Sequence, residues 1–335
     1  MTVLGKRYEH LGPFHDYVAN ERLAARNAIL QEVVPTGELI QIPCLCGASD
    51  EDVLLSSIDR WGIPSSHVLC RRCGLLRVTP RWDDDTYSRI YAGYYWFLAV
   101  GQREITRERF ELSINRAASF AASLSKHVDL EDRHVLELGC SYGAGLITLK
   151  GEKAATLTGY DLDDRIVELG RQYSGLDLRL GGVKEAIAQA KNKYDVVVLR
   201  HVFEHVLHPF EEGSLLKELI NENGFIFIEV PGVLNPGAWT PDPMTFFNAF
   251  HAYSYSLRTL SRVMERCGFE LVHGDEHIYS IWKKTDVQRE SPWESSDGAQ
   301  DILAFIRRME QLRKLRQSVP GRLWNRLRSV FSYRS

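Results

Sequence analysis

The segment VLELGCSYGAG, residues 135–145, limits the fold of this chain more than any other stretch. It begins with an apolar run that only Glu137 interrupts, continues into a turn with three glycines, and leads into a helical pattern at Leu146. A glycine-rich turn between a buried strand and a helix lets the backbone approach a ligand that lies over the helix N-terminus. The segment therefore predicts the first strand–turn–helix unit of a nucleotide-binding sheet.

Strand and helix patterns alternate after this segment. Further strands are expected at 155–161, 176–180, 194–200 and 224–230, helices at 163–173, 184–190, 211–220 and 256–268, and a closing ribbon at 269–274 and 277–284. Such alternation is typical of helices packed on a parallel sheet. The predicted fold class is therefore α/β, with a doubly wound, mostly parallel, seven-stranded Rossmann-like sheet that binds ligands at the carboxyl ends of its strands.

The residues after the first two strands distinguish between cofactors. Asp161 follows the second strand, 22 positions after Gly139, where a carboxylate can accept both hydroxyls of a ribose. The turn reads E-x-G-x-S-x-G, not the G-x-G-x-x-G of dinucleotide-binding proteins. Glu137 would repel a pyrophosphate but suits a cofactor that carries an ammonium and a sulfonium. The sequence therefore favours S-adenosylmethionine.

Four of the six cysteines form two close pairs, namely Cys44 with Cys46 and Cys70 with Cys73. Thiolates on two tight turns can converge on one tetrahedral Zn²⁺, and the glycine after each pair permits the positive φ that such turns often need. The first pair is one residue shorter than the usual C-x-x-C, so His67 is a reserve ligand should Cys44 not reach. The alternative is four unrelated buried cysteines. A closed site of this kind would be structural.

Three segments resemble motifs of class I S-adenosylmethionine-dependent methyltransferases: VLELGCSYGAG (135–145), TGYDLDD (158–164) and YDVVVLRHVFEHVLHP (194–209). The cysteine pairs, followed by LLRVTPRWDDDTYSRIYAGYYW (75–96), resemble the zinc-binding module that precedes this domain in many bacterial sugar-tailoring enzymes. The resemblance implies a cofactor site made of Glu137, Gly139, Cys140, Ser141, Gly143, Asp161, Leu162, Gly182, Val183, Arg200 and His201. Within it, Asp161 would hold the ribose hydroxyls, and Leu162, with the backbone of Gly182 and Val183, would contact adenine.

Titratable residues after the fourth and fifth strands are the candidates for catalysis: His201, Glu204, His205 and His251. If residues 201–205 are helical, the first three share one face. Three interpretations stay open. A histidine acts as general base, with His251 the first choice and His205 the next. The four residues bind a divalent metal. Glu204 and His205 merely hydrogen-bond within the fold.

The acceptor is inferred from further resemblance. HAYSYSL (251–257) is similar to a segment of deoxysugar C-methyltransferases, but this chain lacks the acidic residues before it and the large domain after it. O-methylation of a sugar, in a nucleotide-sugar or surface glycan, is therefore favoured. The alternatives are an RNA or small-aromatic methyltransferase, or an inactive zinc-ribbon adaptor. The aromatic segment 91–97 either covers the substrate or packs two domains together.

Charge and hydropathy restrict partners and location. A net charge of −3 argues against general nucleic-acid binding, and no apolar run approaches the length of a membrane span, so the cytoplasm is expected. The basic tail from Arg307 to Arg334 would contact an anionic membrane or lipid-linked glycan at the inner membrane face; the alternatives are a solvated helix or a dimer contact. The expected regions are a helical lead-in (1–40), the zinc module (41–80), a linking segment (81–128), the methyltransferase domain (129–285) and a linker with a helical tail (286–335).

Overall fold

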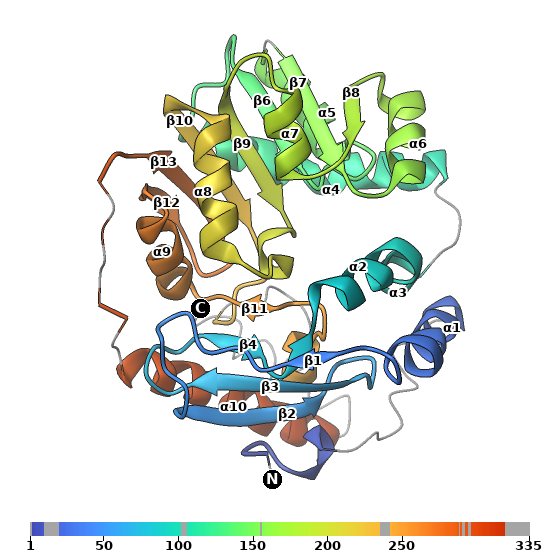
Figure 1. Ribbon diagram of the computed structural model, residues 1–335, viewed down its shortest axis with the longest axis vertical. Coiled ribbons are helices and arrows are strands. Elements are labelled where there is room, and N and C mark those ends of the chain that lie inside the picture. Colours follow the sequence, from blue (N-terminus) through green and yellow to red (C-terminus); the bar gives the residue numbers. More distant parts are fainter. Residues whose placement is uncertain are drawn as a thin grey trace.

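A sheet of seven strands, in the order β12-β13-β10-β9-β6-β7-β8, occupies one half of the protein (Figure 1). The computed structural model describes residues 2–9, 20–101, 106–154, 156–234, 242–287, 289, 292–293 and 296–318. The strands of this sheet are β6 (His134–Leu138), β7 (Thr156–Asp161), β8 (Asp177–Leu180), β9 (Tyr194–Arg200), β10 (Ile220–Glu229), β12 (Phe269–Gly274) and β13 (Tyr279–Lys284). Only the pairings of β13 are antiparallel. The mostly parallel Rossmann-like sheet is therefore confirmed.

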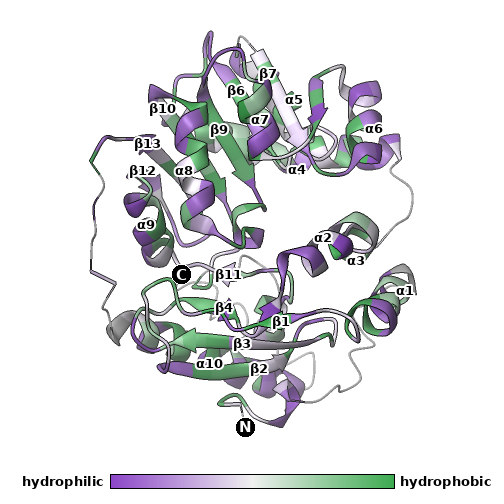
Figure 2. Cartoon of the chain, in the orientation of Figure 1, coloured by the Kyte–Doolittle hydropathy of each residue, from purple (hydrophilic) through white to green (hydrophobic). Residues whose placement is uncertain are grey.

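Helices cover both faces of this sheet, and the alternation of side chains along β9 shows how. Val197 and Leu199 pack in the cluster that contains α8 and α9, whereas Val196 and Val198 pack in the cluster that contains α4 and α5. A parallel strand buried on both faces is apolar throughout, and β9 is green in Figure 2. The helices of this half are α4 (Arg107–Ser125), α5 (Ala144–Leu149), α6 (Asp164–Ser174), α7 (Val183–Gln189), α8 (Pro209–Leu219) and α9 (Leu257–Arg266).

A second sheet, antiparallel and in the order β11-β4-β3-β2, lies in the other half (Figure 1). Its strands are β2 (Asp52–Ile58), β3 (Pro64–Cys70), β4 (Leu76–Val78) and β11 (Tyr253–Ser254). A short ribbon of β1 (Leu39–Ile40) and β5 (Arg81–Trp82) flanks it. Because β11 follows β10 in the sequence, the segment expected to form a separate module at 41–80 completes its sheet with residues from far downstream.

Three further helices lie outside the two sheets, and one of them precedes strands β1–β5 in the sequence while two follow them. They are α1 (Asn20–Ala28), α2 (Asp84–Gly93) and α3 (Tyr95–Val100), and α1 packs on α3. Within the expected helical lead-in (1–40), the α-helix ends at Ala28 and the chain continues as a π-helical turn to Val33. The Asp83 carboxylate caps α2 by accepting a hydrogen bond from the Thr86 N–H.

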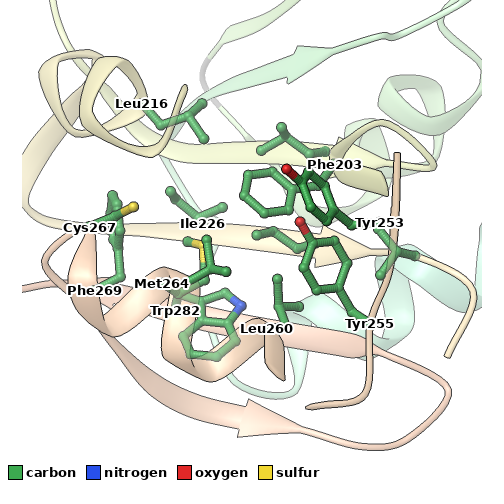
Figure 3. Packing of buried hydrophobic residues seen from close by; sticks show 14 of the residues in the cluster. Phe203, Leu216, Ile226, Tyr253, Tyr255, Leu260, Met264, Cys267, Phe269 and Trp282 are labelled. Atoms are coloured by element: carbon green, nitrogen blue, oxygen red, sulfur yellow. The ribbon is translucent and has the colours of Figure 1, made fainter. Parts of the chain in front are cut away.

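The two halves share one hydrophobic core, part of which Figure 3 shows. Tyr253 of β11 and the nearby Tyr255 are fully buried, and the Tyr255 ring lies 5.9 Å from the ring of Phe203, which follows β9. The same cluster contains Trp282 of β13 and Met264 of α9. The antiparallel sheet is therefore fixed to the larger sheet by direct packing.

The last described helix, α10 (Ser296–Ser318), packs on the antiparallel half. Ile302, Ile306 and Met309 are buried in the cluster that contains β2 and β3. The more distal part of the basic tail, with Arg322, Arg326, Arg328 and Arg334, lies outside the described residues. None of the described helices has the length and hydrophobicity that a membrane span requires.

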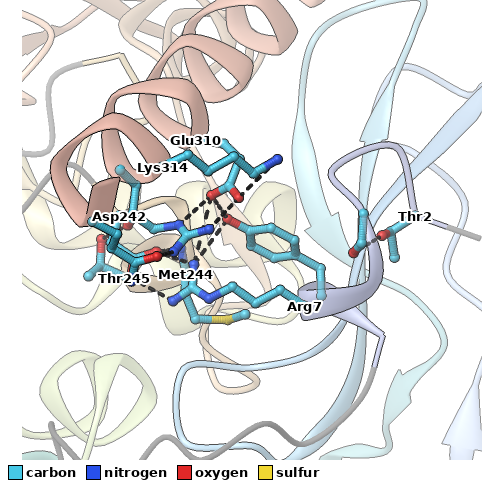
Figure 4. A network of polar contacts seen from close by, with 11 residues as sticks. Thr2, Arg7, Asp242, Met244, Thr245, Glu310 and Lys314 are labelled. Atoms are coloured by element: carbon cyan, nitrogen blue, oxygen red, sulfur yellow. Dashed lines mark hydrogen bonds and ion pairs between the residues drawn. The ribbon is translucent and has the colours of Figure 1, made fainter. Parts of the chain in front are cut away.

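Polar contacts around Glu310 attach α10 to the N-terminal segment (Figure 4). The buried Glu310 carboxylate accepts hydrogen bonds from the Tyr8 hydroxyl at 2.6 Å and from Arg313 at 2.6 and 2.7 Å. Next to it, Arg7 makes a bidentate ion pair with Asp242 at 2.6 and 2.7 Å. Residues from both ends of the described chain thus meet in one network.

Replacing Glu310 with alanine is expected to destabilise the protein by about 2 kcal/mol, because the buried Tyr8 hydroxyl and Arg313 guanidinium lose their acceptor. The readout is the thermal midpoint, which should fall by several degrees. Asp301→Ala removes an exposed acid from the same helix and should leave the midpoint unchanged. Equal midpoints for the two variants would show that this network does not hold α10 in place.

Candidate active site

The turn after β6 adopts the backbone that its glycines predicted. Gly139, Ser141 and Gly143 all have positive φ, at 68°, 50° and 78°. A Cβ at Gly139 would lie 2.3 Å from a methyl of Val202, so only glycine fits there. Ser141 adopts the left-handed conformation despite its side chain, and its N–H donates to the Asp161 carboxylate at 2.8 Å. Asp161 therefore stabilises the conformation of the turn through this hydrogen bond.

An acid and an arginine lie beneath this turn. Glu137 is buried, and a Cβ on Gly145 would come within 3 Å of both of its carboxylate oxygens. Arg200 lies 3.7 Å from Glu137 Oε1 and donates to Glu229 at 2.8 Å. Burial raises the pKa of Glu137 to about 7, although Arg200 opposes this. Within the described part of the chain, Glu137 Oε2 is buried with no hydrogen-bond partner, so the acid can still accept a donor.

The other residues of the expected cofactor site differ in their availability. Leu162 is 74% exposed, which leaves its side chain free to pack on a ring. The Gly182 N–H already donates to Glu185 at 2.8 Å, and Val183 is buried at the start of α7. The Cys140 thiol lies in the core, where a Cβ on Gly159 would be 2.6 Å from Sγ, so only the Cys140 backbone borders the turn.

Three of the catalytic candidates meet in one cluster. One ligand atom each of Glu204, His205 and His251 lies within 4.8 Å of the others. The two imidazole rings are perpendicular, with their centroids 4.8 Å apart. Burial lowers the pKa of both histidines, and that of His251 falls well below its usual range. Both are therefore neutral at pH 7, the form that can accept a proton.

Hydrogen bonding separates the two neutral histidines. His205 Nδ1 lies 2.8 Å from the Phe250 carbonyl oxygen, which only accepts, so this nitrogen carries the proton. The lone pair of His205 Nε2 then accepts from the Tyr95 hydroxyl at 3.2 Å. The ring nitrogens of His251, in contrast, have no hydrogen bond to any residue that the structure describes. His251 is thus the ring free to take a proton from a substrate.

The structure places His201 against two carboxylates. No helix spans 201–205: His201 has a φ of 54°, and a single 3₁₀ turn covers Phe203–His205. The His201 ring turns towards Glu229 at 3.3 Å and Glu204 at 3.7 Å. Burial disfavours its charge, but the two carboxylates outweigh burial and raise its pKa to about 10. A protonated His201 pairs with acids and has no lone pair for base catalysis.

The aromatic segment supplies part of the site wall. The Tyr91 hydroxyl lies 2.9 Å from His205 Nδ1, and Tyr95 packs edge-on against Phe250 with ring centroids 5.4 Å apart. Sequence reasoning did not single out two further residues that lie next to Phe250 or to its ring contacts, Arg60 and Trp61, in the turn between β2 and β3. Nothing in their local sequence distinguishes them from an ordinary surface turn, because the site is formed only when this turn packs on residues 247–250.

The four paired cysteines converge. Cys44 Sγ lies 3.4 Å from Cys73 Sγ, Cys46 Sγ lies 3.7 Å from Cys70 Sγ, and all four lie within 4.8 Å of one another. Tetrahedral thiolates on Zn²⁺ would be about 3.8 Å apart. Gly47 and Gly74 have φ of 81° and 80°, as the turn argument expected. His67 hydrogen-bonds to Ser65 and is not part of the group.

Comparison with known proteins identifies the family. Residues 105–274, about half of the chain, match the family model described as methyltransferase domain. The ubiquinone biosynthesis O-methyltransferase of Bordetella pertussis is 30% identical over 139 residues, which are 40% of this chain and 54% of that protein. The same enzyme of Cereibacter sphaeroides is 30% identical over 115 residues, 33% of this chain and 46% of that protein. This chain thus spans about half the length of the curated relatives it matches.

Solved structures with a similar domain include magnesium protoporphyrin IX methyltransferase from Synechocystis with bound SAH, at 17% identity and a TM-score of 0.40, covering 61% of this chain and all of that one (100%). A SAM-dependent methyltransferase from Archaeoglobus fulgidus is 22% identical with a TM-score of 0.39, covering 53% of this chain and 75% of that one. On the strength of the family match, which extends from α4 to β12 and includes the turn after β6, the chain belongs to the methyltransferase domain family.

Proposed function

We propose that this protein transfers the methyl group of S-adenosylmethionine to a hydroxyl of a sugar, in a nucleotide-sugar or surface glycan, with His251 as general base. The observation that carries the proposal is the neutral, unpaired His251 ring beside Glu204, near the carboxyl ends of β9 and β10. Membership of the methyltransferase domain family supports the reaction class. The sugar rests on the resemblance of the N-terminal half to the modules of sugar-tailoring enzymes.

The residues around the β6 turn fit S-adenosylmethionine. Glu137 offers a buried, unpartnered oxygen to the ammonium group, Asp161 faces the place for the ribose hydroxyls, and the exposed Leu162 suits adenine. When bound, the cofactor supplies an electrophilic methyl group on a sulfonium. The protein aligns the acceptor hydroxyl, and His251 takes its proton. Glu204, buried beside His251, stabilises the imidazolium that forms.

Replacing Asp161 with alanine is expected to weaken S-adenosylmethionine binding about 30- to 100-fold. The change removes a charged acceptor for the ribose and also releases the Ser141 N–H from the turn. Calorimetric titration with the cofactor measures the loss. Asp164→Ala, three residues away at an exposed position, is the matched control and should bind normally. An Asp161 variant that binds within threefold of wild type would contradict the assignment.

Divalent metal binding by the same cluster is the less favoured reading. Glu204, His205 and His251 are close enough to share an ion, but His205 donates from Nδ1 to the Phe250 carbonyl and accepts at Nε2 from Tyr95. Neither nitrogen of His205 then has a lone pair left for a metal. We therefore assign the cluster to proton transfer.

A second candidate acceptor is a small aromatic molecule with a ring hydroxyl. The curated relatives are named ubiquinone biosynthesis O-methyltransferases, and aromatic side chains of Trp61, Tyr91, Tyr95 and Phe250 surround the cluster. Incubation with methyl-labelled S-adenosylmethionine and a panel of nucleotide-sugars, glycans and dihydroxyphenols separates the two. Label in a saccharide supports the first proposal, and label only in phenols supports the second. Label only in RNA or protein would refute both.

We propose further that Cys44, Cys46, Cys70 and Cys73 bind one structural Zn²⁺. The spacing of the four sulfurs and the positive φ at the glycine after each pair support a closed tetrahedral site. Such a site has no open position for a substrate. It would stabilise the two turns that precede β2 and β4.

For the basic tail we propose contact with an anionic membrane surface or lipid-linked glycan, which would place the protein at the inner face of the membrane. Arg307, Arg308 and Arg316 are exposed on α10 and supply positive charge. Sedimentation with vesicles that contain an anionic lipid tests this. Sedimentation of the protein with anionic vesicles but not with neutral ones supports the proposal. A protein that does not sediment with either kind of vesicle but dimerises with increasing concentration would favour a homodimer contact instead.

A further inference from the structure

The turn between β2 and β3 is built to place Arg60 beside His251. The fully buried Asp59 carboxylate accepts from the N–H groups of Trp61 at 2.9 Å and Ile63 at 2.8 Å, which fixes the turn. Its other oxygen accepts from the Ala249 N–H at 3.3 Å. The Arg60 N–H also donates to the Phe247 carbonyl at 2.7 Å. The turn is thereby hydrogen-bonded to the segment that leads directly into His251.

The Arg60 side chain is half-buried and has no matching acid among the residues that the structure describes. Its Cζ lies 4.2 Å from the Trp61 ring centroid, and Nη1 makes one long hydrogen bond of 3.4 Å to the Thr245 carbonyl. Nε is buried and has no hydrogen-bond partner, and the side chain forms no ion pair with a carboxylate in the described part of the chain. The neighbouring Asp59 uses its oxygens on backbone N–H groups. An unpaired cation that is partly buried is costly, so this guanidinium is one that a bound anion would stabilise.

Ring packing connects Arg60 to the candidate active site. The Trp61 ring beneath the guanidinium lies 5.9 Å from the Phe250 ring, and Tyr95, which packs on Phe250, hydrogen-bonds to His205. The charge of Arg60 is felt by both His205 and His251, where it adds to the effect of burial in lowering the pKa. Glu204 and the Tyr95 hydroxyl act on Arg60 in turn. The guanidinium therefore lies in the same aromatic cluster as the two neutral histidines.

A second guanidinium reinforces the positive potential. Arg22 of α1 lies against α3, the helix that begins at Tyr95, and its charge disfavours that of Arg60. Arg22 donates to the Ala99 carbonyl at 3.0 Å, and its buried Nε has no hydrogen-bond partner among the described residues. Two arginines that form no ion pair with a described carboxylate favour a ligand with negative charge.

We infer that Arg60, with the added charge of Arg22, binds an oxyanion of the acceptor and so positions the acceptor hydroxyl at His251. The planar fork of a guanidinium matches the paired oxygens of a phosphoryl group or a carboxylate with two parallel hydrogen bonds. In the setting of the proposed function, on which the identity of the acceptor rests, this means a nucleotide-sugar bound through its phosphates or an acidic sugar bound through its carboxylate. Arg60 is a positioning residue, not a proton carrier.

Calorimetric titration of the protein with inorganic pyrophosphate and with glucuronate, each in the presence of S-adenosylhomocysteine, tests the inference. At least one anion should bind the wild type, and Arg60→Gln should weaken it by about 30-fold or more, because the charge that holds it is gone. Arg60→Lys keeps the charge without the fork and should fall in between. Arg116→Gln, on the exposed face of α4, is the matched control and should bind as wild type does. An unchanged thermal midpoint verifies that each variant folds.

The outcomes are distinct. Binding of pyrophosphate alone identifies a phosphoryl group, and binding of glucuronate alone identifies a carboxylate. If neither anion binds at about 10 mM, or if Arg60→Gln binds as tightly as wild type, the inference is wrong. With an anionic acceptor in hand, Arg60→Gln should raise KM more than it lowers kcat, which a merely structural residue would not do.

The proposed function can fail independently. If no saccharide is methylated while anion binding still depends on Arg60, the sugar assignment fails and the anion site stands. If saccharides are methylated while neither anion binds the wild type, or while Arg60→Gln binds the anion as tightly as wild type, the sugar assignment stands and the anion site is refuted.

Discussion

Replacing His251 with asparagine is expected to lower kcat for methyl transfer by about 100- to 10,000-fold, because the acceptor hydroxyl loses its general base. Asparagine keeps the size and polarity of the side chain, so S-adenosylmethionine should bind with unchanged affinity. Single-turnover transfer of label measures the first quantity and calorimetry the second. His273→Asn, in the edge strand β12, is the control and should retain full activity. A His251 variant within threefold of wild type would remove His251 from the mechanism.

The same assignment fixes the sign of the pH dependence. A base works when it is unprotonated, so kcat/KM must fall as the pH drops through its pKa. Burial lowers the pKa of His251 well below 6.5, and four nearby groups act in the same direction, namely His205, Arg60, His201 and His67. The acidic limb of the profile is therefore expected below pH 6.5. The Arg60→Gln variant lacks a positive charge that disfavours protonation of His251, so the pKa of His251 should rise. The acidic limb of its profile should therefore lie at higher pH than that of the wild type. A wild-type limb at or above 6.5 would point to a different base.

The second large effect concerns the cysteine cluster. Purified protein should contain about one zinc per chain, and Cys73→Ser should lose most of it and unfold several degrees lower, because the metal joins two turns within the shared core. Elemental analysis and a thermal melt give the two readouts. Cys267→Ser changes a buried cysteine outside the cluster, where the hydroxyl can replace the weak contact to the Phe210 carbonyl, and should keep its zinc. Wild-type protein with well under one zinc per chain would refute the closed site.

The larger sheet could be predicted from the sequence because each of its central strands has an apolar pattern within its own few residues. Runs such as YDVVVLR at 194–200 give β9 its length and burial without reference to the rest of the chain, and the turn at 139–145 needs its glycines for reasons of backbone geometry alone. The convergence of the cysteine pairs followed from their spacing in the same way. These are the features that short-range patterns can encode.

The remaining features depend on contacts between distant segments. β11 has only two residues and forms because Tyr253 and Ser254 pair with β4, about 175 positions earlier in the sequence. A strand this short has no alternating pattern of apolar residues from which it could be predicted. The role of His201 depends on a positive φ at a non-glycine residue and on Glu229 from the next strand. Arg60 enters the site only through the contact of its turn with residues 247–249. None of these three features could be predicted from the sequence, because each depends on contacts between the two halves of the protein.

The pairing of β11 with β4 also limits how this protein can be recombined. His251 lies two residues before Tyr253, so the register of the antiparallel sheet sets the position of the imidazole ring. Consider a chimera in which residues 1–80 come from a relative and residues 242–255 come from this protein. Its β4 and β11 would come from different proteins, so their side chains would not be matched to each other. Exchange of acceptor specificity between such enzymes should therefore succeed only when both segments are transferred as one unit.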